Sequence, residues 1–158
     1  MSGAVGLFGK LPAHGDFVRR NLPRDFIAGW DAWLSEGILA LDGALVPDSW
    51  RFRLSPGECG AAAVAGVVIP SEDMVGRRFP ITFAVALEPD GAGPAEGWFD
   101  ALEAVPLHGS ADEVLALLPA IIPGDACPLG LWRPGQGPHA FAGGYAALAP
   151  TDETAAES

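Results

Sequence analysis

The sequence contains little cysteine, and its two cysteines are far apart. Cys59 and Cys127 stand in unlike contexts, with no CxxC pair and no histidine at a ligand spacing from either one. Disulfide frameworks and zinc sites depend on regularly spaced cysteines or on cysteine and histidine together. The sequence therefore indicates neither, and we expect two buried free thiols and no bound metal.

Long hydrophobic runs are also missing. The longest, "AAAVAGVVI" at residues 61–69, is far shorter than the roughly 20 apolar residues that cross a bilayer. The N-terminal "MSGAVGLFGK" lacks the basic segment and apolar segment of an export signal. We therefore expect no membrane insertion and place the protein in the cytoplasm.

Positive charge is scarce, above all in the second half of the chain. The 158 residues carry nine Lys and Arg against 20 Asp and Glu, which gives a net charge of −11, and Arg133 is the single basic residue after residue 80. An acidic surface repels phosphate backbones, which argues against nucleic acid as a partner. The acidic half either keeps a cytosolic protein in solution or faces a basic surface of a protein partner.

Apolar residues, by contrast, are plentiful. Hydrophobic side chains make up 49% of the sequence and charged ones 18%, which is typical of a chain that folds around its own core. We expect one domain over residues 1–148. Residues 149–158 contain no large apolar side chain and are predicted to form a disordered acidic tail.

The hydrophobic pattern predicts an α/β fold. It indicates helices at 24–42, at 94–105 and from 110 to near Pro119, and strands at 4–10, 49–54, 61–69, 81–87, 129–133 and 139–148. Strands and helices do not alternate strictly, and the links between the middle strands are short. We therefore predict a mixed, mostly antiparallel sheet with helices packed on one or both faces, an α/β/α-like sandwich.

Three local patterns refine this prediction. Trp30 and Trp33 fall on the apolar stripe of the first helix, which favours core packing over a ligand surface. Ser110 and Glu113 have the spacing of a capping box at the start of the third helix. In "WRFRL", residues 50–54, apolar side chains alternate with two arginines, as in a strand with one buried face and one solvent face.

The stretch "GLFGKLPAHGDFVRRNLP", residues 6–23, contains residue types that can take part in binding or catalysis. Gly9-Lys10 is similar to the end of a Walker A loop, but Leu11 stands where that motif needs Ser or Thr for Mg²⁺. We therefore expect no nucleotide and no cofactor. His14, Asp16 and Cys59 supply the residue types of a small hydrolase, although no nucleophile signature surrounds the cysteine. That enzyme remains an alternative.

A second polar loop, "DMVGRRFP" at residues 73–80, contains the pair Arg77 and Arg78. A guanidinium binds a carboxylate or phosphate through two parallel hydrogen bonds. The pair is predicted to hold Asp16 of the first loop, or else an acidic or phosphorylated group of a partner; Asp16 could instead cap backbone. Lys10, Asp16, Arg77 and Arg78 are therefore candidates for a structural clamp or for a partner surface.

Four blocks of the sequence, taken in order, carry a family resemblance. They are "GLFGKLPAHGDFVRRNLP", "FIAGWDAWL", "WRFRLSPGECG" and "GVVIPSEDMVGRRFPITF", and they extend from Gly6 to Phe83, about half of the chain. Together they resemble the TagF family, also called ImpM, of proteins encoded with bacterial type VI secretion systems. Beyond Phe83 the resemblance is loose and centres on "LGLWR".

The resemblance implies a regulatory function. Members of this family act in the cytoplasm as post-translational repressors of secretion-system assembly, through a scaffold protein with a forkhead-associated (FHA) domain, and they are not known as enzymes. Some relatives carry a PP2C-type phosphatase domain, whose metal-binding aspartate pattern this sequence lacks, so no phosphatase activity is expected. A structural accessory subunit of the apparatus is a further alternative.

Overall fold

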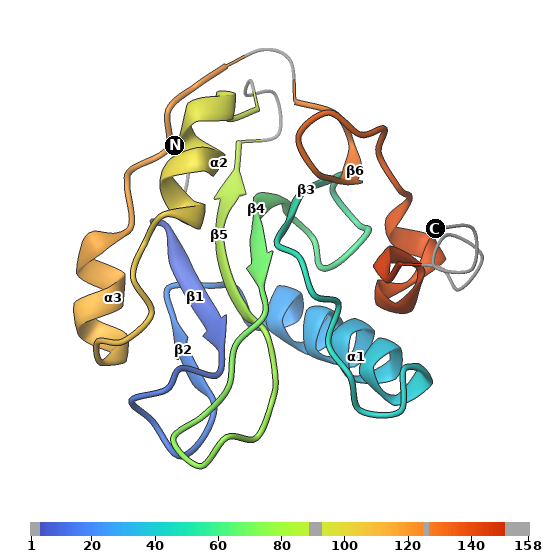
Figure 1. Cartoon of the computed structure of the whole chain (residues 1–158). Helices are drawn as coiled ribbons and strands as arrows, with labels where there is room; N and C mark the ends of the chain where they lie inside the picture. The colour runs from blue at the N-terminus through green and yellow to red at the C-terminus, as the bar shows by residue number, and fades with distance from the viewer. Residues whose placement is uncertain (1–3, 89–92, 125–126, 151–158) are drawn as a thin grey trace.

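A computed structural model describes residues 4–88, 93–124 and 127–150. Its strands form one six-stranded sheet in the order β2-β1-β5-β4-β3-β6 (Figure 1). The strands are β1 (Gly6–Gly9), β2 (Val18–Arg20), β3 (Trp50–Leu54), β4 (Ala63–Ile69), β5 (Ile81–Leu87) and β6 (Gly130–Trp132). Every pairing in this sheet is antiparallel, which is more uniform than the mixed sheet predicted.

Helices cover both faces of the sheet, which confirms the predicted α/β/α sandwich. Helix α1 (Arg24–Ala40) lies on one face, and α2 (Glu96–Glu103) and α3 (Ala111–Leu117) lie on the other (Figure 1). Alternate residues of each strand supply the two cores. In β1, for example, Phe8 packs into the core beneath α1, and Leu7 packs into the core beneath α2 and α3.

The two tryptophans of α1 pack into the core, as predicted, with Trp33 partly buried at its edge. Trp30 is fully buried, and its indole Nε1 donates a hydrogen bond of 2.7 Å to the Thr82 hydroxyl in β5. The Trp33 ring stacks on Trp30 with 4.8 Å between centroids, and its Nε1 donates to the Phe141 carbonyl at 2.8 Å. The pair therefore joins α1 both to the sheet and to the C-terminal segment.

The boundaries of α3 confirm the predicted capping box. The Ser110 hydroxyl accepts a hydrogen bond from the Glu113 amide at 3.2 Å, and the Glu113 carboxylate accepts one from the Ser110 amide at 2.9 Å. These bonds satisfy two amides that the first turn leaves without helical acceptors and lower the pKa of Glu113. The helix ends at Leu117, two residues before Pro119.

The strand predicted at 139–148 is wrong. This segment forms two 3₁₀ turns, Phe141–Gly143 and Tyr145–Leu148, which pack on α1, and His139 alone pairs with β6 through Leu131. Gly144, with φ of 88°, breaks the extended run. The buried Tyr145 hydroxyl accepts a hydrogen bond from the Val46 amide at 2.9 Å, and burial raises the pKa of Tyr145 to about 12.

Strand β3 departs from the expected solvent-facing arginines. Arg51 is 1% exposed and lies beneath α2, where its guanidinium pairs with Asp100 and, at 2.9 Å, with Glu103. Burial alone would lower the pKa of Arg51, but the hydrogen bonds from its guanidinium to Glu103 and Asp100 outweigh that effect and raise it. Both faces of β3 are therefore buried at this point.

Two further predictions concern the cysteines and the membrane. Both cysteines are free; Cys59 is buried as expected, whereas Cys127 is only partly buried. Within the described ranges no helix combines the length and the apolar character needed to span a bilayer. The predicted tail at 149–158 falls, from residue 151 onward, outside the described residues.

Candidate interaction surface

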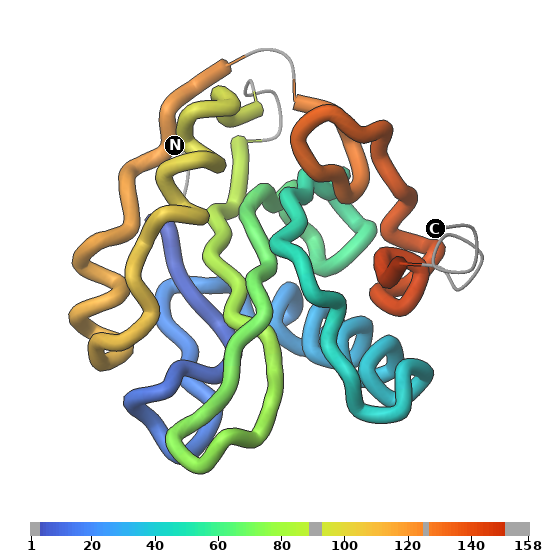
Figure 2. The backbone as a smooth tube through the Cα atoms, in the orientation of Figure 1, coloured from blue at the N-terminus to red at the C-terminus, as the bar shows by residue number. Residues whose placement is uncertain are grey.

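Two loops lie side by side at one end of the sheet (Figure 2). Residues 10–17 connect β1 to β2, and residues 70–80 connect β4 to β5. The loops meet because β1 pairs with β5, with Gly9 opposite Ile81. At Gly9, which has φ of 140°, a Cβ atom would lie 2.0 Å from the Pro80 carbonyl oxygen, so only glycine permits this approach.

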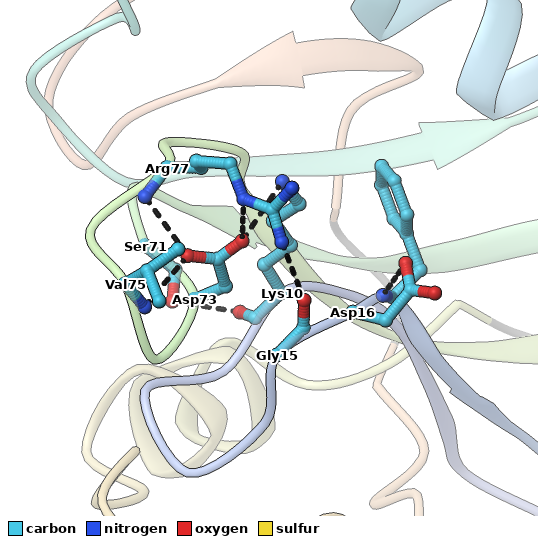
Figure 3. Close-up of polar contacts among 8 residues, drawn as sticks. Lys10, Gly15, Asp16, Ser71, Asp73, Val75 and Arg77 are labelled. Atoms are coloured by element: carbon cyan, nitrogen blue, oxygen red, sulfur yellow. Dashed lines mark hydrogen bonds and ion pairs between the residues drawn. The ribbon is translucent and has the colours of Figure 1, made fainter.

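Asp73 is the centre of the contacts between the two loops (Figure 3). Its fully buried carboxylate accepts hydrogen bonds from the Arg77 amide at 2.9 Å, the Arg77 Nε at 2.7 Å and the Val75 amide at 3.1 Å. The Lys10 ammonium lies 3.2 Å from the same carboxylate. These four donors hold Asp73 as an anion between the loops.

The pKa of Asp73 reflects this surrounding. Burial would raise it, but the Arg77 amide, the Lys10 ammonium, the Arg77 guanidinium and the Val75 amide together lower it to about 2. Asp73 is therefore ionised at every pH near neutrality, and the charge of Lys10, which is 8% exposed, is compensated.

Further hydrogen bonds complete the clamp between the loops. The Arg77 Nη2 donates to the Gly15 carbonyl at 2.6 Å, and the Ser71 hydroxyl donates to the Lys10 carbonyl at 2.7 Å. The Met74 amide donates to the His14 carbonyl at 2.7 Å. The ion pairs and hydrogen bonds of Lys10, Asp73 and Arg77 with these partners are called the loop clamp below.

Of the four candidate residues, two belong to the loop clamp and two lie outside it. Lys10 and Arg77 belong to the loop clamp, whereas Asp16 lies apart from Asp73 and accepts a hydrogen bond from the Phe17 amide at 2.7 Å (Figure 3). Arg78 is exposed, and no ion pair joins it to another described residue. Of the two roles considered for Asp16, backbone capping is the one observed.

Sequence reasoning missed Asp73, the acid that the clamp requires. Its signal was present in "DMVGR", where an aspartate begins a tight turn that closes at Gly76, with φ of 84°. Aspartate in this position accepts backbone amides two to four residues ahead. The same turn places Arg77 four residues after the carboxylate that it binds.

The tips of the two loops expose apolar side chains. Phe17 is 46% exposed, Met74 62% and Val75 70%. The Phe17 ring packs edge-on against Phe79 with 4.9 Å between centroids, so it is held in place although half of it is exposed. Phe17, Met74 and Val75 are called the tip surface below.

A groove of about 530 Å³ begins at the base of the same loops. Its polar lining residues include Arg78, Glu72 and His108. The rest of the lining is mainly apolar and comprises Pro12, Leu45, Val46, Pro47, Pro70 and Leu107. A mostly apolar groove with a few polar groups is typical of a binding site for another molecule.

The three residues of the alternative hydrolase site are not assembled. The His14 Nε2 accepts a hydrogen bond from the Ala111 amide at 2.8 Å, at the start of α3. Cys59 lies in the core beneath α1 on the opposite face of the sheet, where its thiol donates to the Phe26 carbonyl. Burial, with the nearby Asp25 and Glu58 charges, raises the pKa of Cys59 to about 11. A nucleophile needs its base within hydrogen-bond reach, and Cys59 has none there.

Metal ligation finds no support in the described ranges, which contain no group of three His, Cys, Asp or Glu side chains able to hold an ion. The described part of the chain thus offers contact surfaces: an apolar tip beside Arg77, and a groove beside Arg78. Exposed apolar side chains next to arginine are characteristic of protein–protein contact regions.

Comparisons with known proteins agree with the fold. The chain is similar to the crystal structure of PA0076 from Pseudomonas aeruginosa PAO1, with a TM-score of 0.63 and 38% sequence identity. The match covers 74% of this chain and 63% of that one, so it spans less than two thirds of the neighbour's length. No curated protein matches the chain.

The family match covers more of the chain than the four sequence blocks, which end at Phe83. Residues 6–116 match the family described as TagF N-terminal domain, type VI secretion system-associated. The matched range runs from β1 almost to the end of α3, and so includes both faces of the sandwich and the loop clamp. The chain therefore belongs to the TagF family of proteins associated with type VI secretion.

Proposed function

We propose that the protein is a non-enzymatic, post-translational repressor of type VI secretion that acts in the cytoplasm by binding an FHA-domain scaffold protein. Membership of the TagF family supports the association with secretion. The repressor role and the FHA-domain partner are what the family resemblance implies for this chain. The observation that supports binding to a protein is the exposed apolar tip surface, which the loop clamp holds in place.

The clamp makes the tip surface suitable for binding. Residues in flexible loops lose conformational entropy when a partner orders them, and a loop that is already held loses less. Met74 and Val75 follow directly after Asp73, which four donors hold in place. The exposed apolar groups are therefore presented in one arrangement before the partner arrives.

The position of the candidate hydrolase residues supports a non-enzymatic role. His14 and Cys59 lie on opposite faces of the sheet, and the Cys59 thiol is buried and protonated at neutral pH. Binding, in contrast, requires only a surface of the right shape and composition. An exposed surface of this kind is available at the tips of the loops.

Deletion of the gene, with secretion scored, tests the proposal. Repression predicts that secretion rises in the deletion strain and falls again when the wild-type gene is restored. The purified protein should also bind the purified FHA-domain scaffold in a calorimetric titration. Unchanged secretion and no heat of binding would contradict the proposal, and a loss of secretion would indicate a structural accessory subunit instead.

A further inference from the structure

The pairing of the basic side chains shows where positive charge is left uncompensated. All nine lie in the described ranges, and six contact an acidic side chain or a backbone carbonyl: Lys10, Arg20, Arg51, Arg53, Arg77 and Arg133. The other three, Arg19, Arg24 and Arg78, form no ion pair with a described residue. These three exposed arginines therefore present positive charge on a chain whose net charge is −11.

Two of these three arginines line the same hollow. Arg19 and Arg24, together with Arg20, surround a depression of about 210 Å³. These residues come from edge strand β2 and from the start of α1, which follows it in the chain (Figure 1). Asn21, also in the lining, has the left-handed φ of 61° and turns the chain between the strand and the helix. The depression is called the arginine hollow below.

The contacts inside the arginine hollow do not neutralise it. Arg20 donates to the carbonyl of Arg19 at 2.8 Å and pairs with Asp112 at 3.0 Å. That pair is solvent-exposed, with 81% of the Asp112 side chain accessible, so it provides little compensation. The nearest acid in sequence, Asp25, uses its carboxylate on the Phe26 and Ala61 amides.

The start of α1 forms one side of the hollow, and Asp25 in its first turn caps the Phe26 amide. Pro23 occupies the N-cap position and provides no side-chain acceptor, and the first turn of α1 contributes Arg24 and Ile27 to the lining. The first amides of a helix carry partial positive charge that favours anions. Arg19 and Arg24 therefore bring two guanidinium groups without an acidic partner among the described residues to the hollow, beside the exposed pair of Arg20 with Asp112.

We propose that the arginine hollow binds a phosphoryl group. A phosphoryl dianion has three acceptor oxygens and fits several guanidinium forks at once, whereas a single carboxylate satisfies one fork. The hollow is compact, as a tetrahedral anion requires, and differs from the extended groove at the loop clamp. None of its lining residues belongs to the tip surface, so the inference does not depend on the proposed function.

Titration of the full chain tests this proposal and identifies the source of the phosphoryl group. The probes are inorganic phosphate, a phosphothreonine peptide with uncharged flanks, and the same peptide with glutamate in place of the phosphothreonine. Binding is followed by calorimetry and by the shift of the melting temperature. We expect the phosphorylated probes to bind at least tenfold more tightly than the glutamate peptide, and more tightly at pH 7 than at pH 5, because the dianion forms near pH 6.

Variants locate the site. Arg19→Gln combined with Arg24→Gln should weaken phosphoryl binding at least tenfold without changing the fold, since both side chains are exposed and unpaired. Arg133→Gln, outside the hollow, is the matched control and should leave binding unchanged. The proposal would be overturned if the double variant bound the probes as tightly as the wild type does. It would also be overturned if the glutamate peptide bound as tightly as the phosphothreonine peptide, or if neither inorganic phosphate nor the phosphothreonine peptide bound. Preference for the peptide or for free phosphate distinguishes the two sources.

Discussion

The ammonium group of Lys10 lies 3.2 Å from the carboxylate of Asp73, and both side chains are withdrawn from solvent. The two residues come from different loops, and they meet because β1 and β5 are neighbours in the sheet. An ion pair with these surroundings fixes the distance between two loops whose tips are exposed. It therefore connects the stability of the fold with the surface that we propose for binding.

Replacement of Asp73 by asparagine should lower the melting temperature by several degrees, because Lys10 would keep its charge without a buried anion beside it. The pKa of Asp73 is about 2 in the fold and 3.8 ordinarily, so its ionisation stabilises the protein above about pH 4, and this contribution is lost as the pH falls toward 2. Asp73→Asn should remove that part of the acid sensitivity. Asp16→Asn, at an exposed acid, is the control in thermal melts from pH 2 to pH 7, and identical profiles for all three proteins would contradict the assignment.

Charge placed on the tip surface should weaken binding to the FHA-domain scaffold. Met74→Asp and Val75→Asp each put a carboxylate on an exposed apolar contact, and a tenfold loss corresponds to about 1.4 kcal/mol. Leu39→Asp, at an apolar residue of α1 that is 79% exposed, is the matched control. All three should melt like the wild type. If the α1 variant weakens binding as much as the tip variants, the tip surface is not the contact.

Cys59 should resist alkylation under native conditions at pH 7. Its thiol is buried and its pKa is about 11, so almost no thiolate is present, whereas Cys127 is more accessible. Mass spectrometry after limited iodoacetamide treatment should find label on Cys127 first. The Cys59→Ala variant should still repress secretion, and a loss of repression at normal protein levels would favour the enzyme alternative.

Removal of the acid Glu103 should destabilise the fold more than removal of Arg51 itself. Glu103→Ala leaves the buried guanidinium with only the more exposed Asp100 and should destabilise the fold by about 3 kcal/mol. Arg51→Met, which removes the buried charge itself, should cost less. Urea unfolding measures both free energies. If Arg51→Met lowers the free energy of unfolding more than Glu103→Ala does, the buried arginine makes a net stabilising contribution, which would contradict this prediction.

Local patterns in the sequence predicted most of the fold. The stripe that carries Trp30 located α1, and the spacing of Ser110 and Glu113 located the start of α3. These predictions succeed because helical periodicity and capping depend on residues within one or two turns. Strand β2 was missed because three residues, "VRR", are too few to show an alternation. Residues 139–148 were misread because their apolar content outweighed the glycines that end an extended run.

The candidate site was only partly predictable. The sequence singled out the two loops and named Asp16 or a group of a partner as the acid that the arginines could hold, whereas Arg77 binds Asp73 in the structure. The opposite charges of a loop can pair in several ways, and sequence order does not rank them. The tertiary structure decides, because it gives Asp73 four donors and directs Asp16 toward its own backbone.

The sequence by itself determined the family, the class of fold and the position of the main helices and strands, because each is encoded in neighbouring residues. The burial of Arg51, the place of Asp73 between the loops and the gathering of Arg19, Arg20 and Arg24 around one hollow were decided by the tertiary structure. Each depends on which strands lie next to each other and on which face a helix covers. Those relationships arise from contacts between residues far apart in the chain.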